Sequence, residues 1–248
     1  TLIVTTPQTD ERPLTKWFKR DELSDGTAVE GSADDADSLS LVSLGQVCLP
    51  QTLAIVDPET SKELTDGNVG EIWVHGDNMA AGYLNRPEET QETFRNALPT
   101  ANRLDSDSRA GDAPEDNWMR TGDLAVIVDG HLFITGRLKD LIIVAGRNHY
   151  PQDIEATADE ATKHTAPAVI AAFAVEAGGS ANGAADGESV EGLIIVAERD
   201  PDASEDGDAE AIEAMRAAVT ATHGVQPSDV RIIAPGTLPR SSANKIAR

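Results

Sequence analysis

Short apolar runs separated by polar turns fill the first half of the chain. They are rich in β-branched and aromatic residues and have the lengths typical of strands: QTLAIVD, GEIWVHG, DLAVIVD and HLFITG. Asp129 and Gly130 separate the last two runs, and both residue types tolerate the positive φ angles that a tight hairpin turn requires. The pattern therefore predicts a strand-rich region that extends to about residue 136.

The pattern changes after this point, because helical periodicity appears between further apolar runs. Strands are predicted at LIIVAG, AVIAAFAV, GLIIVAE and VRIIA. One helix is predicted to begin at Pro151, and a second carries apolar residues at helical spacing and ends at Gly224. We therefore predict an α+β fold in two domains: residues 1–136, rich in strands, and residues 137–248, a thin sheet with packed helices.

The charge of the chain is strongly negative. Forty-three acidic residues against 20 basic ones give a formal net charge of −23. This balance argues against non-specific binding of nucleic acid, which needs lysine and arginine to neutralise phosphates. Much of the acid lies in stretches rich in Asp, Gly, Ser and Ala that we interpret as solvated loops: EGSADDADS, TANRLDSDSRAGDAPED, EAGGSANGAADGESVEG and ERDPDASEDGDAE.

Cysteine, histidine and hydropathy exclude several classes of protein. No stretch approaches the ~20 apolar residues of a membrane span, so none is predicted. The single cysteine, Cys48, rules out an internal disulfide framework and fits a reducing compartment such as the cytoplasm. The five histidines are scattered without the spacing of metal ligands, so we predict no metal site.

Two polar residues are candidates for nucleotide binding. Asp123 lies at the start of one predicted strand and Arg137 at the end of its hairpin partner, so the hairpin brings them together. A carboxylate can accept hydrogen bonds from the two hydroxyls of a ribose, and a guanidinium can donate to a hydroxyl or phosphate oxygen. The alternative is a surface ion pair that closes the hairpin and contributes ~0–1 kcal/mol.

A third candidate lies in the last segment, LPRSSANKIAR. Its lysine, Lys245, is a compact point charge that can bridge two anionic oxygens, as phosphoryl or adenylyl transfer requires of a cation. The alternative is a solvated lysine in a polar tail.

The order of the motifs resembles that of a known superfamily. GEIWVHGDNMAAGYLNRPEETQETF, WMRTGDL, GRLKDLIIVAGRNHYPQDIE and LPRSSANKIAR are similar to successive core motifs of the acyl-adenylate-forming (AMP-forming ligase) superfamily. Within it, GRNHYPQDIE looks like fatty acyl-AMP ligases rather than acyl-CoA synthetases. The opening and closing stretches resemble the actinobacterial long-chain fatty acyl-AMP ligases that prime mycolic-acid polyketide synthases. The resemblance covers essentially the whole chain.

The resemblance implies a role for individual residues. Asp123 would hold the ribose hydroxyls, Arg137 would reinforce that contact, and Ile134 would pack near the adenine. Lys139 falls at the hinge about which the small domain swings between half-reactions. Lys245 matches the catalytic lysine that bridges the fatty carboxylate and the α-phosphate during adenylation.

The resemblance also implies substrates and partners. A long-chain fatty acid and ATP, with Mg²⁺, would give acyl-AMP and pyrophosphate, and the acyl group would pass to an acyl carrier protein or polyketide synthase. Two alternatives stay open. One is a long-chain fatty acyl-CoA synthetase, and the other is a non-catalytic acidic interaction module.

The chain departs from the family pattern at a few positions. Asn244 stands where a glycine usually precedes the catalytic lysine. Ile143 and Asn148 stand where many CoA synthetases carry lysine and glutamine, which weakens the CoA alternative. Residues 14–44 are our candidate for the insertion with which acyl-AMP ligases restrain the small domain.

Two family motifs do not occur in this sequence. They are the Ser/Thr/Gly-rich phosphate loop and the aromatic-Gly-x-Thr/Ala-Glu motif, both of which lie upstream in the family. We therefore expect a C-terminal fragment of a longer enzyme, comprising the end of the large domain and the small domain. The fragment alone is predicted to be inactive.

Overall fold

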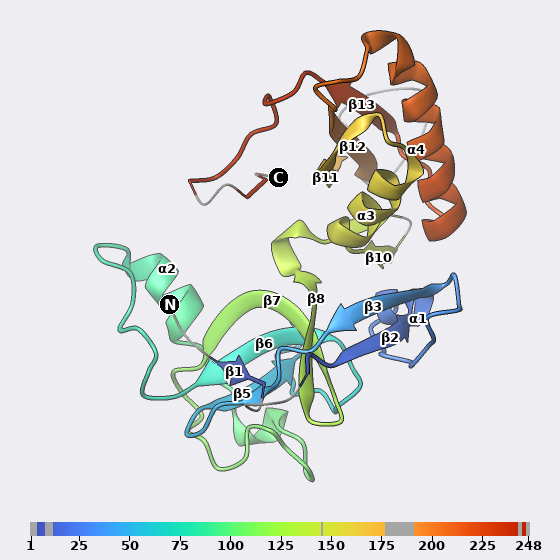
Figure 1. The fold of residues 1–248 in the computed structure, drawn as a ribbon. Helices are drawn as coiled ribbons and strands as arrows, with labels where there is room; N and C mark the ends of the chain where they lie inside the picture. The colour runs from blue at the N-terminus through green and yellow to red at the C-terminus, as the bar shows by residue number, and fades with distance from the viewer. Residues whose placement is uncertain (1–3, 8–11, 145, 177–190, 243–244, 247–248) are drawn as a thin grey trace, which may run out of the picture. The chain divides into compact units, whose positions relative to one another are not determined.

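The computed structural model has two compact units, Thr1–Lys139 (unit 1) and Asp140–Arg248 (unit 2) (Figure 1). It describes residues 4–7, 12–144, 146–176, 191–242 and 245–246. Both units combine helices with strands, so the predicted α+β class is confirmed.

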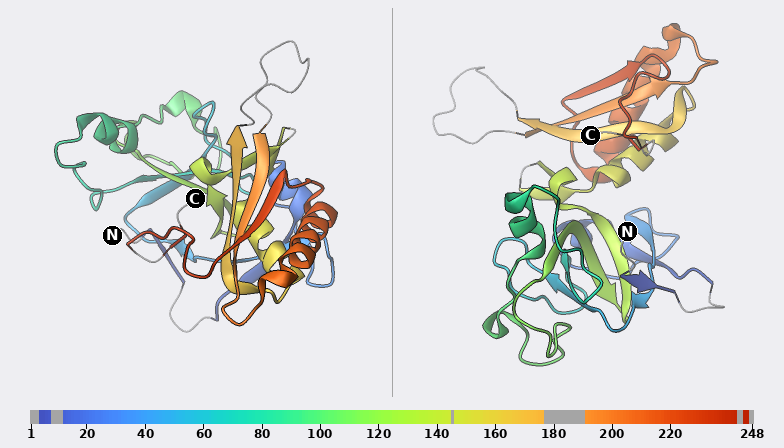
Figure 2. Two further views of the ribbon diagram at one scale, coloured as in Figure 1. Left: turned by 90° about the horizontal axis from the view of Figure 1, so that it is seen from above. Right: turned by 90° about the vertical axis from the view of Figure 1, so that its left-hand side faces the viewer.

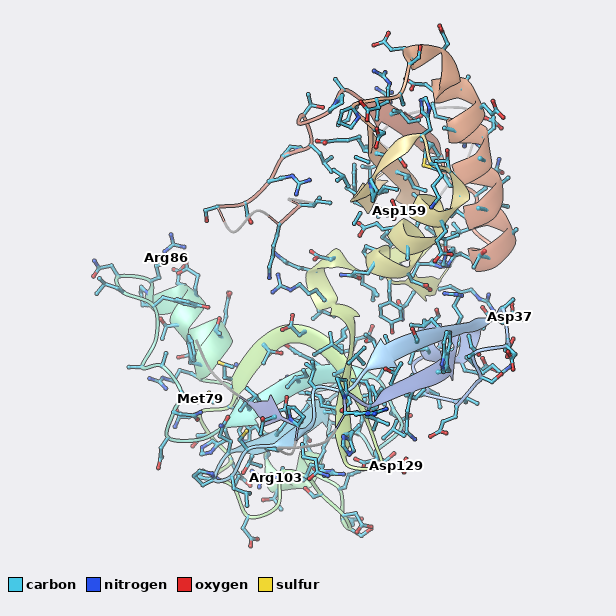
Figure 3. The ribbon with its side chains drawn as sticks, viewed as in Figure 1. Asp37, Met79, Arg86, Arg103, Asp129 and Asp159 are labelled. Carbon is cyan, nitrogen blue, oxygen red and sulfur yellow. The ribbon has the colours of Figure 1, made fainter. Side chains whose placement is uncertain are left out.

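Unit 1 is built on a four-stranded antiparallel sheet. Its strands, in spatial order, are β5 (Thr52–Val56), β6 (Gly70–His75), β7 (Met119–Val128) and β8 (His131–Arg137). These are the strands that the apolar runs predicted. Asp129 and Gly130 have φ angles of 51° and 78° and form the predicted turn between β7 and β8; Asp129 is labelled at its tip in Figure 3.

Both faces of this sheet are buried. Leu53, Ile72 and Ile127 belong to an aliphatic cluster on one face. Trp73 and Trp118 belong to a second cluster that covers the other face. Because successive side chains of a strand point to opposite faces, burial on both sides explains why these runs are continuously apolar rather than alternating.

Smaller elements border the sheet of unit 1. Strands β1 (Thr5–Thr6) and β4 (Gln46–Val47) pair in antiparallel fashion. Helix α2 (Pro87–Phe94) begins with proline at its first position and buries Phe94. A short 3₁₀ helix, η1 (Thr100–Asn102), follows.

The segment from residue 14 to 44 is folded. It forms strand β2 (Thr15–Lys19), helix α1 (Arg20–Ser24) and strand β3 (Ser38–Val42), with β2 and β3 antiparallel. Phe18 is fully buried, and its ring meets that of Phe133 in β8 edge to face, with 5.4 Å between centroids. Lys16 donates to Asp129 at 2.6 Å. This segment is therefore packed onto the β7–β8 hairpin of its own unit.

The acidic stretch at residues 100–116 is not the solvated loop that its composition predicted. It folds around Glu63, whose side chain is only 4% exposed. This carboxylate accepts hydrogen bonds from the backbone N–H groups of Leu104, Arg109 and Ala110 and from the hydroxyl of Ser108, at 2.6–3.2 Å. A buried carboxylate needs such donors to offset its desolvation, and here the loop backbone supplies them.

Unit 2 contains a three-stranded sheet with two helices on the same face (Figure 2). Strand β12 (Glu191–Arg199) lies in the centre, antiparallel to β11 (Thr165–Glu176) and parallel to β13 (Asp229–Ile233). Helices α3 (Pro151–Ala161) and α4 (Asp208–His223) bury Ile154 and Met215 against this sheet. Gly224 ends α4 in the left-handed conformation, as predicted.

Short elements complete the second unit. The 3₁₀ helix η2 (Leu138–Asp140) spans the boundary between the units, and β9 (Ile142–Val144) pairs with β10 (Arg147–His149). Another 3₁₀ turn, η3 (Glu205–Gly207), precedes α4. Asp208, the first residue of α4, accepts from the Nε and Nη2 of Arg199 at 2.9 and 2.7 Å and pairs with His164 at 2.8 Å. This ordered network anchors another stretch that we had interpreted as a solvated loop.

No helix in the described part of the chain is long and apolar enough to cross a membrane.

Candidate functional site

The hairpin of unit 1 brings Asp123 and Arg137 together, as its length predicted. The two residues are directly opposed in the β7–β8 register. The Nε of Arg137 donates to Oδ1 of Asp123 at 3.0 Å. The two side chains are 34% and 53% exposed, so the pair remains open to solvent. Their role in binding a nucleotide stays a prediction.

A bulge in β7 presents Asp123. The β6–β7 register shifts between Glu71 and Trp73, so that residues 121–123 bow out opposite Ile72. Gly122 has a φ of 72°, which a residue without a Cβ adopts without strain. The hydroxyl of Thr121 donates to the carbonyl of Ile72 at 2.9 Å and accepts from the N–H of Asp123 at 3.1 Å.

A buried carboxylate fixes the bulge from the neighbouring strand. Glu71 is 1% exposed. Its Oε2 accepts from the Nε of Arg120 at 2.9 Å and from the indole N–H of Trp73 at 3.0 Å, and its Oε1 accepts from the N–H of Gly122 at 3.0 Å. The Arg120 guanidinium also lies over the Trp73 ring, 5.6 Å from its centroid. The backbone that carries Asp123 is therefore held from inside the sheet.

Sequence reasoning missed Glu71 and Arg120. A signal for Glu71 was present, because a glutamate within the apolar run GEIWVHG occupies a strand that is otherwise buried. Buried glutamates are rare unless they are paired. The identity of the partner was not available from the run itself.

Ile134 and Lys139 lie on or near the same hairpin. Ile134 is half-buried, pairs with Ala125 and packs against the aliphatic cluster of unit 1. Lys139 is exposed within η2, at the boundary between the two units. Their suggested roles, adenine contact and hinge, stay predictions.

Lys245 is exposed on a closed loop of unit 2. The N–H of Ser241 donates to the carbonyl of Lys245 at 2.7 Å, and the N–H of Lys245 donates to the Ser241 hydroxyl at 3.2 Å. Arg240 and Ile246 form an antiparallel bridge around this turn. The substitution at Asn244 lies outside the described residues. The loop can therefore be closed without recourse to the family's usual glycine being identified there.

The two positions that weakened the CoA alternative face each other. Ile143 of β9 and Asn148 of β10 are opposed in the antiparallel register, and Ile143 is 46% exposed. The departures from the CoA synthetase pattern thus fall on one small hairpin.

The described residues contain no group of three or more His, Cys, Asp or Glu side chains that could hold a metal ion.

Comparisons with known proteins place this geometry in context. The profile of the family described as AMP-binding enzyme matches residues 23–84. The chain is 41% identical, over its whole length, to the long-chain-fatty-acid–AMP ligase FadD32 of Mycobacterium marinum. It is 35% identical, again over its whole length, to the putative fatty-acid–CoA ligase FadD21 of Mycobacterium tuberculosis.

Solved structures give the same picture. A structure from a study of fatty acyl-adenylate ligases of E. coli and L. pneumophila matches all of this chain, with a TM-score of 0.76 and 26% identity. A structure of McyG A-PCP with phenylalanyl-adenylate matches 90% of it, with a TM-score of 0.64 and 27% identity. The chain spans 41% of the FadD32 sequence and 38% and 35% of these two structures.

Proposed function

We propose, from the chain's relationship over its whole length to AMP-forming fatty acid ligases, that it forms part of a long-chain fatty acyl-AMP ligase. In the proposed reaction a fatty carboxylate oxygen attacks the α-phosphorus of ATP. The bond between the α- and β-phosphates breaks, and pyrophosphate leaves. The acyl group of the acyl-AMP then passes to the thiol of a carrier protein or polyketide synthase, and AMP leaves.

The observation that carries the proposal is the way unit 1 holds an exposed ion pair. An exposed pair such as Asp123–Arg137 contributes only ~0–1 kcal/mol to stability. A bulge, a glycine with positive φ and the buried carboxylate of Glu71 are more than the closure of a hairpin requires. Rigid support for solvent-accessible polar groups is instead what a binding site needs.

Each candidate residue has a role in the proposed reaction. Asp123 accepts hydrogen bonds from the ribose hydroxyls, and Arg137 donates to a ribose oxygen. Ile134 contacts the adenine. Lys245 supplies positive charge to the fatty carboxylate and the α-phosphate, where negative charge must be stabilised during adenylation. Lys139 is the hinge.

Mg²⁺ accompanies ATP in this proposal. Since the described residues lack a cluster of metal-ligating side chains, we assign no residue of this chain to the ion. The ion neutralises charge on the phosphates. We also propose a cytoplasmic enzyme, because the single cysteine, Cys48, is a free thiol.

The ribose contact is tested by Asp123→Ala in the full-length enzyme. Hydrogen bonds to a charged group contribute ~1.5–3 kcal/mol each, so the variant is expected to lose about tenfold to hundredfold in ATP binding. Asp129→Ala is the matched control, because it removes a carboxylate that is also ion-paired, from the turn of the same hairpin. Equal ATP affinity in both variants contradicts the assignment of Asp123.

The catalytic lysine is tested by measuring the two half-reactions separately. Lys245→Ala is expected to reduce acyl-AMP formation by ~10²–10³. Transfer of the acyl group from supplied acyl-AMP to the carrier is expected to proceed at a near-normal rate, because the lysine is proposed to act in adenylation only. Lys163→Ala, an exposed lysine of the same unit, is the control. Unchanged adenylation in Lys245→Ala removes this residue from the site.

A fatty acyl-CoA synthetase is the second candidate, favoured by the 35% identity to a putative fatty-acid–CoA ligase. The two candidates differ in the acceptor of the acyl group. An acyl-AMP ligase supplied with CoA and ATP accumulates acyl-AMP, whereas a CoA synthetase converts it to the thioester. Rapid acyl-CoA formation by the full-length enzyme decides for the synthetase.

A further inference from the structure

A glutamate of unit 2 is buried on the face of the sheet that points away from the helices. Ile195 and Ala197 of β12 belong to the helix-covered core. Because side chains alternate along a strand, Glu198 points to the opposite face. It is nevertheless only 5% exposed.

The chain that follows β13 contacts this glutamate. Oε2 of Glu198 accepts from the N–H of Gly236 at 2.8 Å, and Oε1 accepts from the N–H of Leu238 at 2.7 Å. Gly236 has a φ of 75°, and the Thr237 hydroxyl donates to the carbonyl of Ala234 at 2.6 Å, so the backbone turns here. The two carboxylate oxygens thus clamp backbone groups that lie 38 and 40 residues further along the chain.

The electrostatics show that the clamp is ionic. Burial by itself raises the pKa of Glu198, but the N–H groups of Gly236 and Leu238 and the positive charge of Arg240 lower it. The net pKa lies below the usual value, so the carboxylate stays ionised at neutral pH. Both hydrogen bonds are therefore charge-assisted, which makes them stronger than bonds between neutral groups.

The clamp lies immediately before the loop that carries Lys245. Only Pro239 separates Leu238 from Arg240, where the loop begins, and the proline ring fixes its own φ. The bridge between Arg240 and Ile246 closes the loop at its other end. A displacement of Leu238 would therefore be transmitted to the lysine with little flexible chain to absorb it.

We propose that Glu198 is a positioning residue for Lys245, which it orients by clamping the backbone at Gly236 and Leu238. The proposal rests on the proposed function of Lys245 in adenylation. The ladder of unit 2 does not depend on the Glu198 carboxylate, because β12 is hydrogen-bonded through its backbone to both neighbours. Loss of the carboxylate should thus move the loop and leave the sheet intact.

The test is Glu198→Gln, which keeps the shape of the side chain but only one oxygen acceptor. One of the two backbone N–H groups then faces an NH₂ group and loses its acceptor. Glu155→Gln is the matched control, because Glu155 also accepts from a backbone N–H of this unit, that of Ala172 at 2.9 Å. Lys245→Ala is measured in parallel.

Two readouts are expected to agree. In the full-length enzyme, Glu198→Gln lowers the rate of acyl-AMP formation about tenfold or more and leaves acyl transfer from supplied acyl-AMP unchanged. In the 248-residue chain, hydrogen exchange at Gly236 or Leu238 becomes faster, while the amide of Val230 in β13 stays protected. The Glu155→Gln control changes neither the half-reactions nor these two amides.

The outcomes separate this proposal from the proposed function. If Lys245→Ala abolishes adenylation and Glu198→Gln does not reduce it, the positioning role is wrong and the function stands. If Glu198→Gln reduces both half-reactions equally, or exposes the Val230 amide as well, the residue only stabilises the unit and the proposal is overturned. If Lys245→Ala has no effect on adenylation, the proposed function fails first.

Discussion

Replacement of Glu71 by glutamine tests whether a buried carboxylate holds the Asp123 bulge. Glu71 receives hydrogen bonds from the Arg120 guanidinium, the Trp73 indole and the Gly122 N–H. Glutamine has the same shape but one oxygen instead of two. It can accept from Gly122 or from the Arg120 and Trp73 donors, but it cannot serve both groups.

The size of the effect follows from burial. Glu71 is 1% exposed, so water does not replace the acceptor that is lost. A buried donor left without an acceptor costs ~1–3 kcal/mol, and breaking a fully buried ion pair costs ~3–5 kcal/mol. The side chain of Arg120 is 33% exposed and recovers part of its hydration. We therefore expect a loss of about 2–3 kcal/mol in the free energy of unfolding of unit 1.

Tryptophan fluorescence during urea unfolding reports this loss selectively. The three tryptophans of the chain, at positions 17, 73 and 118, all belong to unit 1. With a urea dependence of about 2 kcal/mol per M, the unfolding midpoint should fall by about 1 M. The control is Glu30→Gln, which removes an exposed carboxylate paired with Lys16 and is expected to cost less than about 1 kcal/mol.

A midpoint for Glu71→Gln that matches the Glu30→Gln control would refute the reasoning. A stability loss without weaker ATP binding in the full-length enzyme would separate the two parts of the argument. In that case Glu71 stabilises the sheet, but the bulge does not depend on it to present Asp123.

Three further predictions concern packing, acid and activity. Phe18→Ala is expected to cost about 3–5 kcal/mol by the same fluorescence assay, because it removes a fully buried ring that packs on Phe133; a loss below about 1 kcal/mol means that the segment is not part of the core. The pKa of Asp208 is lowered from 3.8 to about 2 by hydrogen bonds from Arg199, so its contribution to stability is present above pH 4 and lost as pH falls towards 2. Solvent screening leaves about 1 kcal/mol, which should appear as a difference between Asp208→Asn and the parent chain at pH 6 that vanishes near pH 2 when followed by the Met215 methyl resonance. The 248-residue chain alone is expected to release no pyrophosphate from ATP and a fatty acid, and measurable release would show that the missing family motifs are dispensable.

The strands of both units were predictable because each is a local apolar run. The β7–β8 turn was predictable for the same reason, since Asp129 and Gly130 specify it without help from distant residues. The two-stranded sheet formed by β2 and β3 was not identified. Its runs are short and mixed with charge, and only the contact of Phe18 with Phe133 gives it a core.

The candidate site was predictable to the same extent. Asp123 and Arg137 lie on one hairpin, so their spacing along the sequence predicted their contact. The partners of Glu71 and Glu198 could not be found in this way. Glu71 binds residues of β7 about 50 positions away, and Glu198 binds backbone N–H groups, which leave no mark in the sequence.

The loop folded around Glu63 illustrates what this means for the drift of sequences over time. Three of its four bonds to the carboxylate come from main-chain N–H groups, at positions 104, 109 and 110. Every residue type except proline supplies that group. Side chains along this loop are therefore free to change while its path stays fixed, provided that Glu63 is kept and proline is absent at those positions. A saturation library of the loop should show this as broad tolerance interrupted only by proline, so that an alignment of such loops would look unstructured although the loop itself is ordered.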